Sequence, residues 1–353
     1  MNIILSILIA ILTIFALKTK NKQQISGLGD RRFLIAIVCA VFPYLDYSFT
    51  FLSKPIELAY HNTFLSSIIL TPVYALGLTA FFNTIFGNKV DAKFLFPSIL
   101  GTMLVVLFFN LLGTTELALF YPFSDIKFSF NILHSFNLIL FLILAAGVIM
   151  TTVSKTSRRD AARVSLAVVA VFLLAVFSFA IKARFAVSDY AKALNLEVTE
   201  THVLAQPLSV FNWRLMLMTK DGKIHDSFIT LRDKPLEFKN DGRTNRVAQL
   251  YRPSKKAVWR IYRQVNPNYK KQFDVIVNRY GDNQVMRNTL KYSILKDAVN
   301  YQQYRCLRFK DLRTEGIRKS LKGNTLFCQN PKTKDFKVLY GTKETYEDIT
   351  NLF

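Results

Sequence analysis

The stretch of sequence that decides the fold is residues 164–183, VSLAVVAVFLLAVFSFAIKA, in which Lys182 is the one charged side chain. A helix needs about 20 predominantly apolar residues to cross a hydrocarbon core of about 30 Å. Four earlier apolar stretches have that length, and a fifth, at the N-terminus, is slightly shorter. The five lie at residues 2–17, 33–52, 63–86, 94–120 and 129–150. We therefore predict a membrane α-helical bundle of about six transmembrane helices.

The N-terminal stretch carries its basic residues after the apolar run, at Lys18, Lys20 and Lys22. A cleaved signal peptide has them before its apolar segment. The sequence therefore favours a retained helix whose N-terminus lies outside the cytoplasm.

The whole chain has 353 residues, 51% of them hydrophobic, with a mean hydropathy of +0.23 and a formal net charge of +22. Disorder requires low hydrophobicity, and a soluble domain rarely contains such long apolar runs. Residues 1–184 hold 15 basic and 7 acidic side chains, whereas residues 185–353 hold 31 and 17, a net of +14. We predict a transmembrane helical domain over 1–184 and a small, basic, soluble α+β domain over 185–353.

The loops between the apolar stretches differ in charge, which sets the orientation. Basic loops occupy residues 18–32 and 151–163, and a weakly positive loop lies at 89–93, whereas 53–62 and 121–128 are near neutral. Basic loops stay in the cytoplasm. The sequence therefore predicts a multi-pass protein of the bacterial inner (cytoplasmic) membrane, with both termini and the C-terminal domain extracytoplasmic.

The second half shows patterns of both strand and helix. Residues 213–218 alternate into a Lys-Asp-Gly-Lys turn at 220–223, which indicates a hairpin. Residues 273–278 and 336–339 resemble further strands, and 283–300 is compatible with a helix.

Three cysteines occur in the chain. Cys39 lies within an apolar stretch and is expected to be a small packing residue. An oxidising compartment would permit a disulfide between Cys306 and Cys328, and two buried free thiols are the equal alternative.

A few polar residues lie at or near the predicted membrane depth, where each is costly. They are Asp46, His61, Asn110, Glu116, His134 and Asn137, and the helix plan places all of them toward the extracytoplasmic face. Three or four converging His, Asp or Glu side chains could bind zinc or another divalent metal. The candidate ligands are Asp46, His61 and His134, with Glu116 as a further ligand or general base. The alternative is a hydrogen-bonded polar plug between helices.

Several motifs, in this order, carry a resemblance to a known family. Pro43-Tyr44-Leu45-Asp46 closes one apolar stretch, and HNTFLSS at 61–67 opens the next. YPFSDIKFS follows at 121–129, PLSVFNWR at 207–214, and Asp-Leu-Arg at 311–313. The chain resembles the YdjM-like family of LexA-regulated inner-membrane, metal-dependent hydrolases. The resemblance implies a zinc-phospholipase-C-like helical core in which a metal activates water against a phosphoester.

The chain departs from the family pattern at most of the implied ligands. Tyr44, Ser66, Val106 and Asn110 stand where the family has Asp, His, His and Asp, Glu116 stands at a glycine, and the last Asp falls near Asn137. Valine cannot bind a metal, and Asp46 and His61 are the implied ligands that remain. The resemblance therefore implies a hydrolase scaffold with a degenerate metal site.

Two functions follow from these patterns. The first is a non-catalytic or lipid-binding membrane protein on that scaffold, and the alternative is an active hydrolase of a phosphoester or lipid. The basic C-terminal domain predicts attraction to anionic lipid head groups or cell-envelope polymers, and a solvated basic surface without a lipid role is the equal alternative. Its extracytoplasmic location argues against nucleic acid as a partner, and few intramembrane charges and no inverted repeat argue against a transporter.

Overall fold

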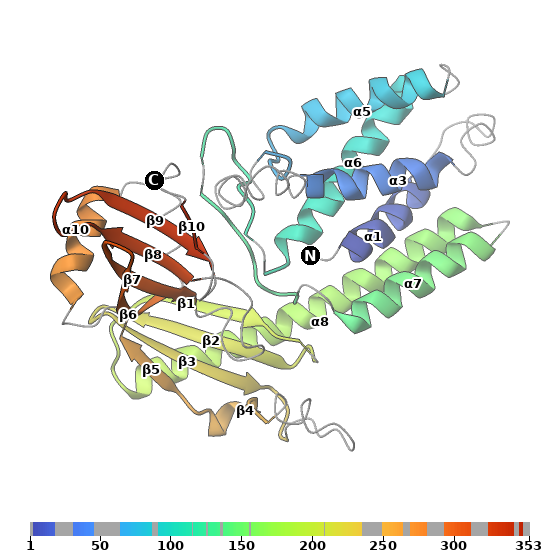
Figure 1. Ribbon diagram of the computed structural model, residues 1–353. Coiled ribbons are helices and arrows are strands. Elements are labelled where there is room, and N and C mark those ends of the chain that lie inside the picture. The colour runs from blue at the N-terminus through green and yellow to red at the C-terminus, as the bar shows by residue number, and fades with distance from the viewer. Residues whose placement is uncertain are drawn as a thin grey trace.

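The computed structural model gathers the helices of the N-terminal half at one end of the molecule and two β-sheets at the other (Figure 1). It describes residues 3–17, 31–45, 64–86, 91–114, 116–124, 126–134, 137–154, 157–207, 209–234, 249–263, 269–280, 293–311, 324–341 and 346–348. The helical part contains α1 (Ile3–Ala16), α3 (Arg31–Val41), α5 (Thr71–Ile85), α6 (Ala92–Leu111), α7 (Leu138–Val153) and α8 (Arg158–Ala193).

The predicted bundle of about six transmembrane helices with a zinc-phospholipase-C-like core is wrong. Within the described ranges, two helices, α6 with 20 residues and α8 with 36, are long and apolar enough to cross a membrane by length and composition. The helices α1, α3, α5 and α7 have 14, 11, 15 and 16 residues. At about 1.5 Å per residue they are shorter than a hydrocarbon core of about 30 Å.

The shorter helices end inside the apolar stretches because specific residues interrupt them. A 3₁₀ turn at residues 42–45 follows directly on α3 and contains Pro43. In α5, Pro72 occupies one of the first two positions, so the helix begins at Thr71 although the apolar run begins earlier. The side chain of Asn137 accepts a hydrogen bond from the N–H of Leu140 and caps the start of α7.

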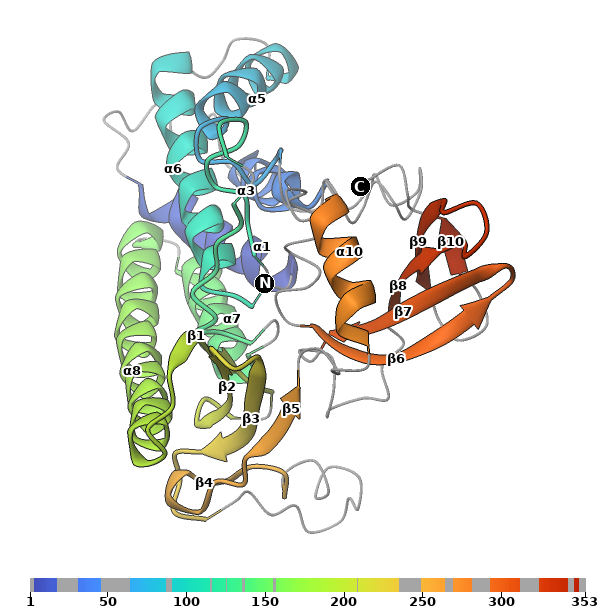
Figure 2. The same cartoon turned by 90° about the vertical axis from the view of Figure 1, so that its left-hand side faces the viewer.

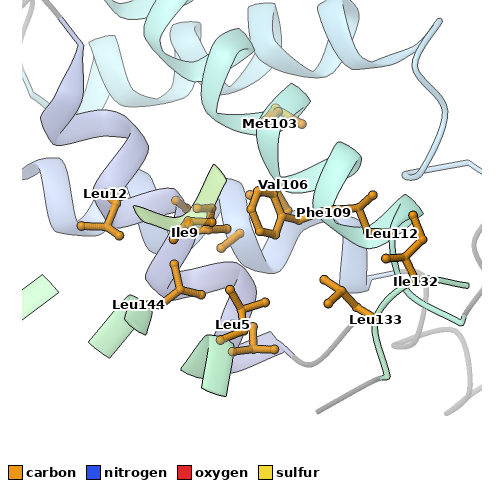
Figure 3. Close-up of a cluster of buried hydrophobic side chains, with 14 of the residues drawn as sticks. Leu5, Ile9, Leu12, Met103, Val106, Phe109, Leu112, Ile132, Leu133 and Leu144 are labelled. Atoms are coloured by element: carbon orange, nitrogen blue, oxygen red, sulfur yellow. The ribbon is translucent and has the colours of Figure 1, made fainter. Parts of the chain in front are cut away.

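The helices pack around an apolar core that involves α1, α6 and α7. Figure 3 shows Leu5, Ile9 and Leu12 of α1 beside Val106 of α6 and Leu144 of α7. These five side chains are 0–1% exposed. The short helix α1 is therefore enclosed by its neighbours rather than presented to the surroundings on all sides.

The first sheet packs against the outer part of α8. Its strands are β1 (Val198–Ala205), β2 (Asn212–Thr219), β3 (Lys223–Thr230), β4 (Arg252–Pro253) and β5 (Arg260–Arg263), with a 3₁₀ turn at Ser254–Lys256. The order is β1-β2-β3-β4, and β5 also pairs with β3. Figure 2 shows α8 running beside β1 and β2. The apolar core of the helices continues into this sheet through Trp213, Leu215 and Leu217.

The second sheet is an antiparallel meander covered by one helix. It consists of β6 (Ser293–Tyr301), β7 (Tyr304–Asp311), β8 (Asn324–Gln329), β9 (Phe336–Gly341) and β10 (Tyr346–Asp348), and α10 (Lys270–Tyr280) packs on it (Figure 2). Cys306 of β7 lies opposite Cys328 of β8, and a disulfide joins them. Of the two alternatives for these cysteines, the structure therefore contains the bonded pair.

The expectations for the second half are partly confirmed. The hairpin around residues 220–223 is present as β2 and β3, and residues 336–339 lie in β9. Residues 273–278 belong to α10 rather than to a strand, because Phe273, Ile276 and Val277 share one helical face that packs on the second sheet. The described part of 283–300 is strand β6. The strands of this half form two five-stranded sheets.

Candidate functional site

The structure describes two of the four predicted site residues. Asp46 and His61 lie outside the described residues. Glu116 and His134 are half-buried on the connection between α6 and α7. Within the ranges that the structure describes, no three His, Cys, Asp or Glu side chains are arranged to hold a metal ion. The predicted metal site, which depends on Asp46 and His61, stays a prediction.

A polar link joins three segments of the helical part. Tyr44 Oη donates a hydrogen bond to Asn110 Oδ1 at 2.8 Å, and Ser6 Oγ lies 2.8 Å from Tyr44 Oη. Asn110 is 5% exposed and Ser6 is fully buried. Because the tyrosine proton is given to Asn110, the serine hydroxyl is the donor in the second bond. The three groups are neutral and join α1, the 3₁₀ turn and α6.

Basic side chains gather at the opposite end of the helices. Arg31 lies over the Phe86 ring at 4.9 Å, and Arg32 lies over the Phe15 ring at 5.6 Å. Arg163 Nε donates to the carbonyl of Ala16 at 3.2 Å. These contacts place the start of α3, the end of α1, the end of α5 and the start of α8 at the same end of the helical part. The positive charges of Arg31, Arg32 and Arg163 are therefore concentrated at that end.

The helix α8 exposes a continuous apolar stripe. Val164, Val168, Val171, Leu174, Phe177, Ile181 and Phe185 follow each other at helical spacing and are 39–69% exposed. Exposed apolar surface of this extent marks contact with a membrane or another protein. From residue 164 to residue 181 the helix has no charged side chain, a length of about 27 Å. Arg163 lies before this segment and Lys182 lies after it.

Around Lys182 and beyond it, aromatic contacts join α8 to the first sheet and to Phe211, which directly precedes β2. The rings of Tyr190 and Trp259 stack at 3.8 Å, and Tyr190 Oη lies 2.9 Å from His225 Nδ1. Phe179 also contacts Phe211, with ring centroids 4.7 Å apart. These contacts extend over about three turns of the helix. The sheet and the outer part of α8 therefore form one packed body.

His225 is a side chain that could act as an acid or a base, but it is buried and cannot reach a substrate. It is 3% exposed, and burial lowers the pKa of its imidazole, with the charge of Lys223 acting in the same direction and that of Asp221 opposing it. The ring is therefore held neutral, bonded to Tyr190. Because a general base must reach the proton that it removes, this enclosed imidazole is suited to a structural role.

On the other face of the first sheet, Arg214 and Asp226 form a buried ion pair. Arg214 Nε and Nη2 donate to the two carboxylate oxygens of Asp226 at 2.7 and 3.0 Å, and their side chains are 2% and 1% exposed. The guanidinium also lies over the Phe228 ring at 4.7 Å. Two parallel hydrogen bonds therefore pair the buried guanidinium and carboxylate across β2 and β3.

A groove of about 530 Å³ lies between the end of α8 and β1. Arg184, Ser188 and Lys192 line it from the helix, and Thr201 and Val203 line it from the strand. Its lining contains two basic side chains and no acidic one. Pockets that hold small molecules or head groups have volumes of about 300–1,000 Å³. The groove therefore combines the size of a binding site with a positive charge.

No model of a protein family, no curated protein and no solved structure matches this chain.

Sequence reasoning missed the groove and the buried ion pair. The groove is signalled weakly by Lys182 and Arg184 at the end of the longest apolar stretch. Nothing in the sequence pairs Arg214 with Asp226, because the two lie on different strands.

Proposed function

We propose that the protein is a membrane-bound, non-catalytic protein of the bacterial inner membrane whose basic C-terminal half lies outside the cytoplasm and binds anionic lipid. The observation that carries this proposal is α8. Its uncharged segment of about 27 Å matches a hydrocarbon core, has arginine at its start and Lys182 at its end, and continues into a packed sheet.

Two independent features support the orientation. Arg31, Arg32 and Arg163 gather at the level where α8 begins, and basic residues remain on the cytoplasmic side of a membrane. The disulfide between Cys306 and Cys328 lies at the other end, and disulfides persist in oxidising compartments such as the periplasm. Charge and redox chemistry therefore favour the same direction for α8.

The hydrogen-bonded link of Ser6, Tyr44 and Asn110 supports the absence of catalysis. A cation site at these helices would need negative charge, and the two described positions that carry carboxylates in the resembling family hold neutral groups bonded to each other.

Metal analysis of the purified full chain separates the proposal from the alternative of an active hydrolase. We expect less than stoichiometric zinc or manganese after dialysis against metal-free buffer. Stoichiometric metal that disappears in both Asp46→Ala and His61→Ala would refute the proposal and favour the hydrolase. Ser66→Ala serves as the matched control, because it alters a neutral residue in the same motif.

A reporter fused after Phe353 tests the orientation separately. An alkaline phosphatase fusion should be active and a green fluorescent protein fusion dark, because the first requires export and the second folds in the cytoplasm. The reverse pair of results would overturn the orientation. Resistance of the protein to alkaline carbonate extraction tests membrane insertion itself, whichever way the chain is oriented.

A further inference from the structure

The groove between α8 and β1 lies where a lipid head group would be. The uncharged segment of α8 ends at Ile181, and Arg184 follows within one turn. The wall residues Arg184, Ser188 and Lys192 are spaced four apart, so they lie along one side of the helix. Eight residues place Lys192 about 12 Å farther from the apolar segment than Arg184. The groove therefore extends outward from the level of the membrane surface.

The chemistry of the walls fits a phosphate attached to an apolar body. Arg184 supplies a planar, permanently charged guanidinium group that can donate two parallel hydrogen bonds to phosphate oxygens. Lys192 adds a second cation. Ser188 and Thr201 provide hydroxyl groups for a polar head. Asn195 adds an amide, and the rest of the wall is apolar, contributed by residues such as Val187 and Val203. The groove does not fit a zwitterionic head group as well, because no acidic side chain lines it to pair with a choline or an amine.

The surface around the membrane end of the groove is itself apolar. Phe185, adjacent to Arg184, is 63% exposed, and Ile181 is 39% exposed. An exposed aromatic ring beside a basic side chain at the end of an apolar helix segment is suited to the boundary between acyl chains and head groups. Acyl chains leaving the groove would therefore meet apolar protein rather than water.

We propose that this groove binds one anionic phospholipid of the outer leaflet, with its phosphate on Arg184 and the outward part of its head group near Lys192. This assignment rests on the proposed function, since it requires α8 to cross the membrane with the sheets on the extracytoplasmic side. It goes beyond a general attraction to negative surfaces because it gives a single, saturable site to a protein with many exposed basic residues.

Binding to the full-length protein in a neutral detergent tests the site. The probe is short-chain phosphatidylglycerol, titrated against the protein and followed by native mass spectrometry, with phosphatidylcholine of the same chain length as the comparison. We expect one phosphatidylglycerol per chain. The double variant Arg184→Gln, Lys192→Gln should bind it at least about tenfold more weakly, because each substitution removes a charge-assisted hydrogen bond to the phosphate.

The matched control removes the same charge elsewhere. Lys255 and Lys256 are exposed, lie on the 3₁₀ turn after β4 and do not line the groove, so Lys255→Gln, Lys256→Gln should retain the wild-type affinity. If both double variants lost affinity for phosphatidylglycerol to the same extent, the groove site would be overturned in favour of diffuse attraction between the lipid and the basic surface. Ser188→Leu narrows the groove without changing charge and should also abolish the single bound lipid. The emission of the tryptophans, Trp213 and Trp259, confirms that each variant retains the first sheet.

Further outcomes are decisive. Equal binding of phosphatidylglycerol and phosphatidylcholine would overturn the assignment to an anionic lipid. Competition by glycerol phosphate at the same concentration as the lipid would show a site for small anions instead. If no lipid binds while carbonate extraction and the fusions behave as expected, the groove assignment fails and membrane anchoring stands. If the fusions report a cytoplasmic C-terminus, the proposed orientation fails with it.

Discussion

Replacing Gly147 by alanine tests the packing of α7 against α8. A methyl group at this position would lie 2.7 Å from Ser165 Cβ, 2.8 Å from its Oγ and 3.3 Å from Leu12 Cδ1. Ser165 Cβ is attached directly to the backbone of α8, and its Oγ donates to the carbonyl of Ala161 at 2.8 Å. The clash can therefore be relieved only by moving one helix away from the other.

The magnitude follows from comparison with a second glycine. At Gly101 in α6 a methyl group would meet nothing within 4 Å. Both substitutions gain about 0.5–1 kcal/mol of helix propensity, so that contribution cancels in the difference between them. What remains is overpacking, and we expect Gly147→Ala to be about 1–3 kcal/mol less stable than Gly101→Ala.

The chain contains a suitable probe for this measurement. Cys39 in α3 is a free thiol with 0% exposure, and the other two cysteines are joined in a disulfide. A thiol-reactive dye therefore reports the opening of the helical part during heating in detergent. Gly147→Ala should lower the labelling midpoint below that of Gly101→Ala, and adding Ser165→Gly should restore it. Equal midpoints for the two alanine variants, or no rescue by Ser165→Gly, would refute the packing argument.

Three further predictions concern the sheets. Asp226→Asn leaves Arg214 buried without its counter-ion, and unfolding followed by tryptophan fluorescence should show a loss of about 3–5 kcal/mol. Cys306→Ser opens a link across 22 residues and should lower the free energy of unfolding by about 3 kcal/mol in the chain-entropy description, with an extra thiol titrating from Cys328. Because burial lowers the pKa of His225, the unfolded chain binds the proton first, so stability should fall as the pH drops below about 6.5.

The three predictions about the sheets are each tested against a control or a result that would contradict them. Glu197 pairs with Lys220 on the surface, both side chains being about three-quarters exposed, so Glu197→Gln should leave the midpoint unchanged. An equal effect of Asp226→Asn and Glu197→Gln would contradict the importance of burial. A wild-type protein with three titratable thiols before reduction would contradict the disulfide. A pH profile that is unchanged in His225→Gln would assign the acid sensitivity to other groups.

The sequence located the apolar helices well and their ends poorly. Each apolar stretch with described residues contains a helix, because apolar residues are buried together whatever the length of the element. The ends depend on single residues such as Pro43, Pro72 and Asn137, whose effect a hydropathy average over about 20 positions removes. Helix length, and with it the number of spans, was therefore overestimated.

The second half was harder to predict for a different reason. Residues 270–280 are rich in β-branched and aromatic side chains, which favoured a strand, yet Phe273, Ile276 and Val277 have the spacing of a helix face. Tertiary contact with the second sheet decided between the two. Composition was a weaker guide there than periodicity.

The candidate sites depend on partners that are distant in the chain. Ser6 and Tyr44 are 38 residues apart, and Tyr44 and Asn110 are 66 apart. The sequence identified Asn110 as a costly polar residue and offered a hydrogen-bonded plug as an alternative to a metal. It could not identify Tyr44 and Ser6 as the partners in the link to Asn110, since pairing over such separations is a property of the packed helices.

The uninterrupted course of α8 has a mechanical consequence. Its 36 residues extend over about 54 Å, and it packs through Tyr190 on Trp259 and through Phe179 on Phe211, which directly precedes β2. A long apolar helix adapts to a thinner bilayer by tilting. Because α8 continues without a break from its apolar segment into the part that packs on the first sheet, a tilt of the helix also rotates the sheet. In the proposed orientation, the height and angle of the sheet above the lipid would therefore follow the thickness of the bilayer.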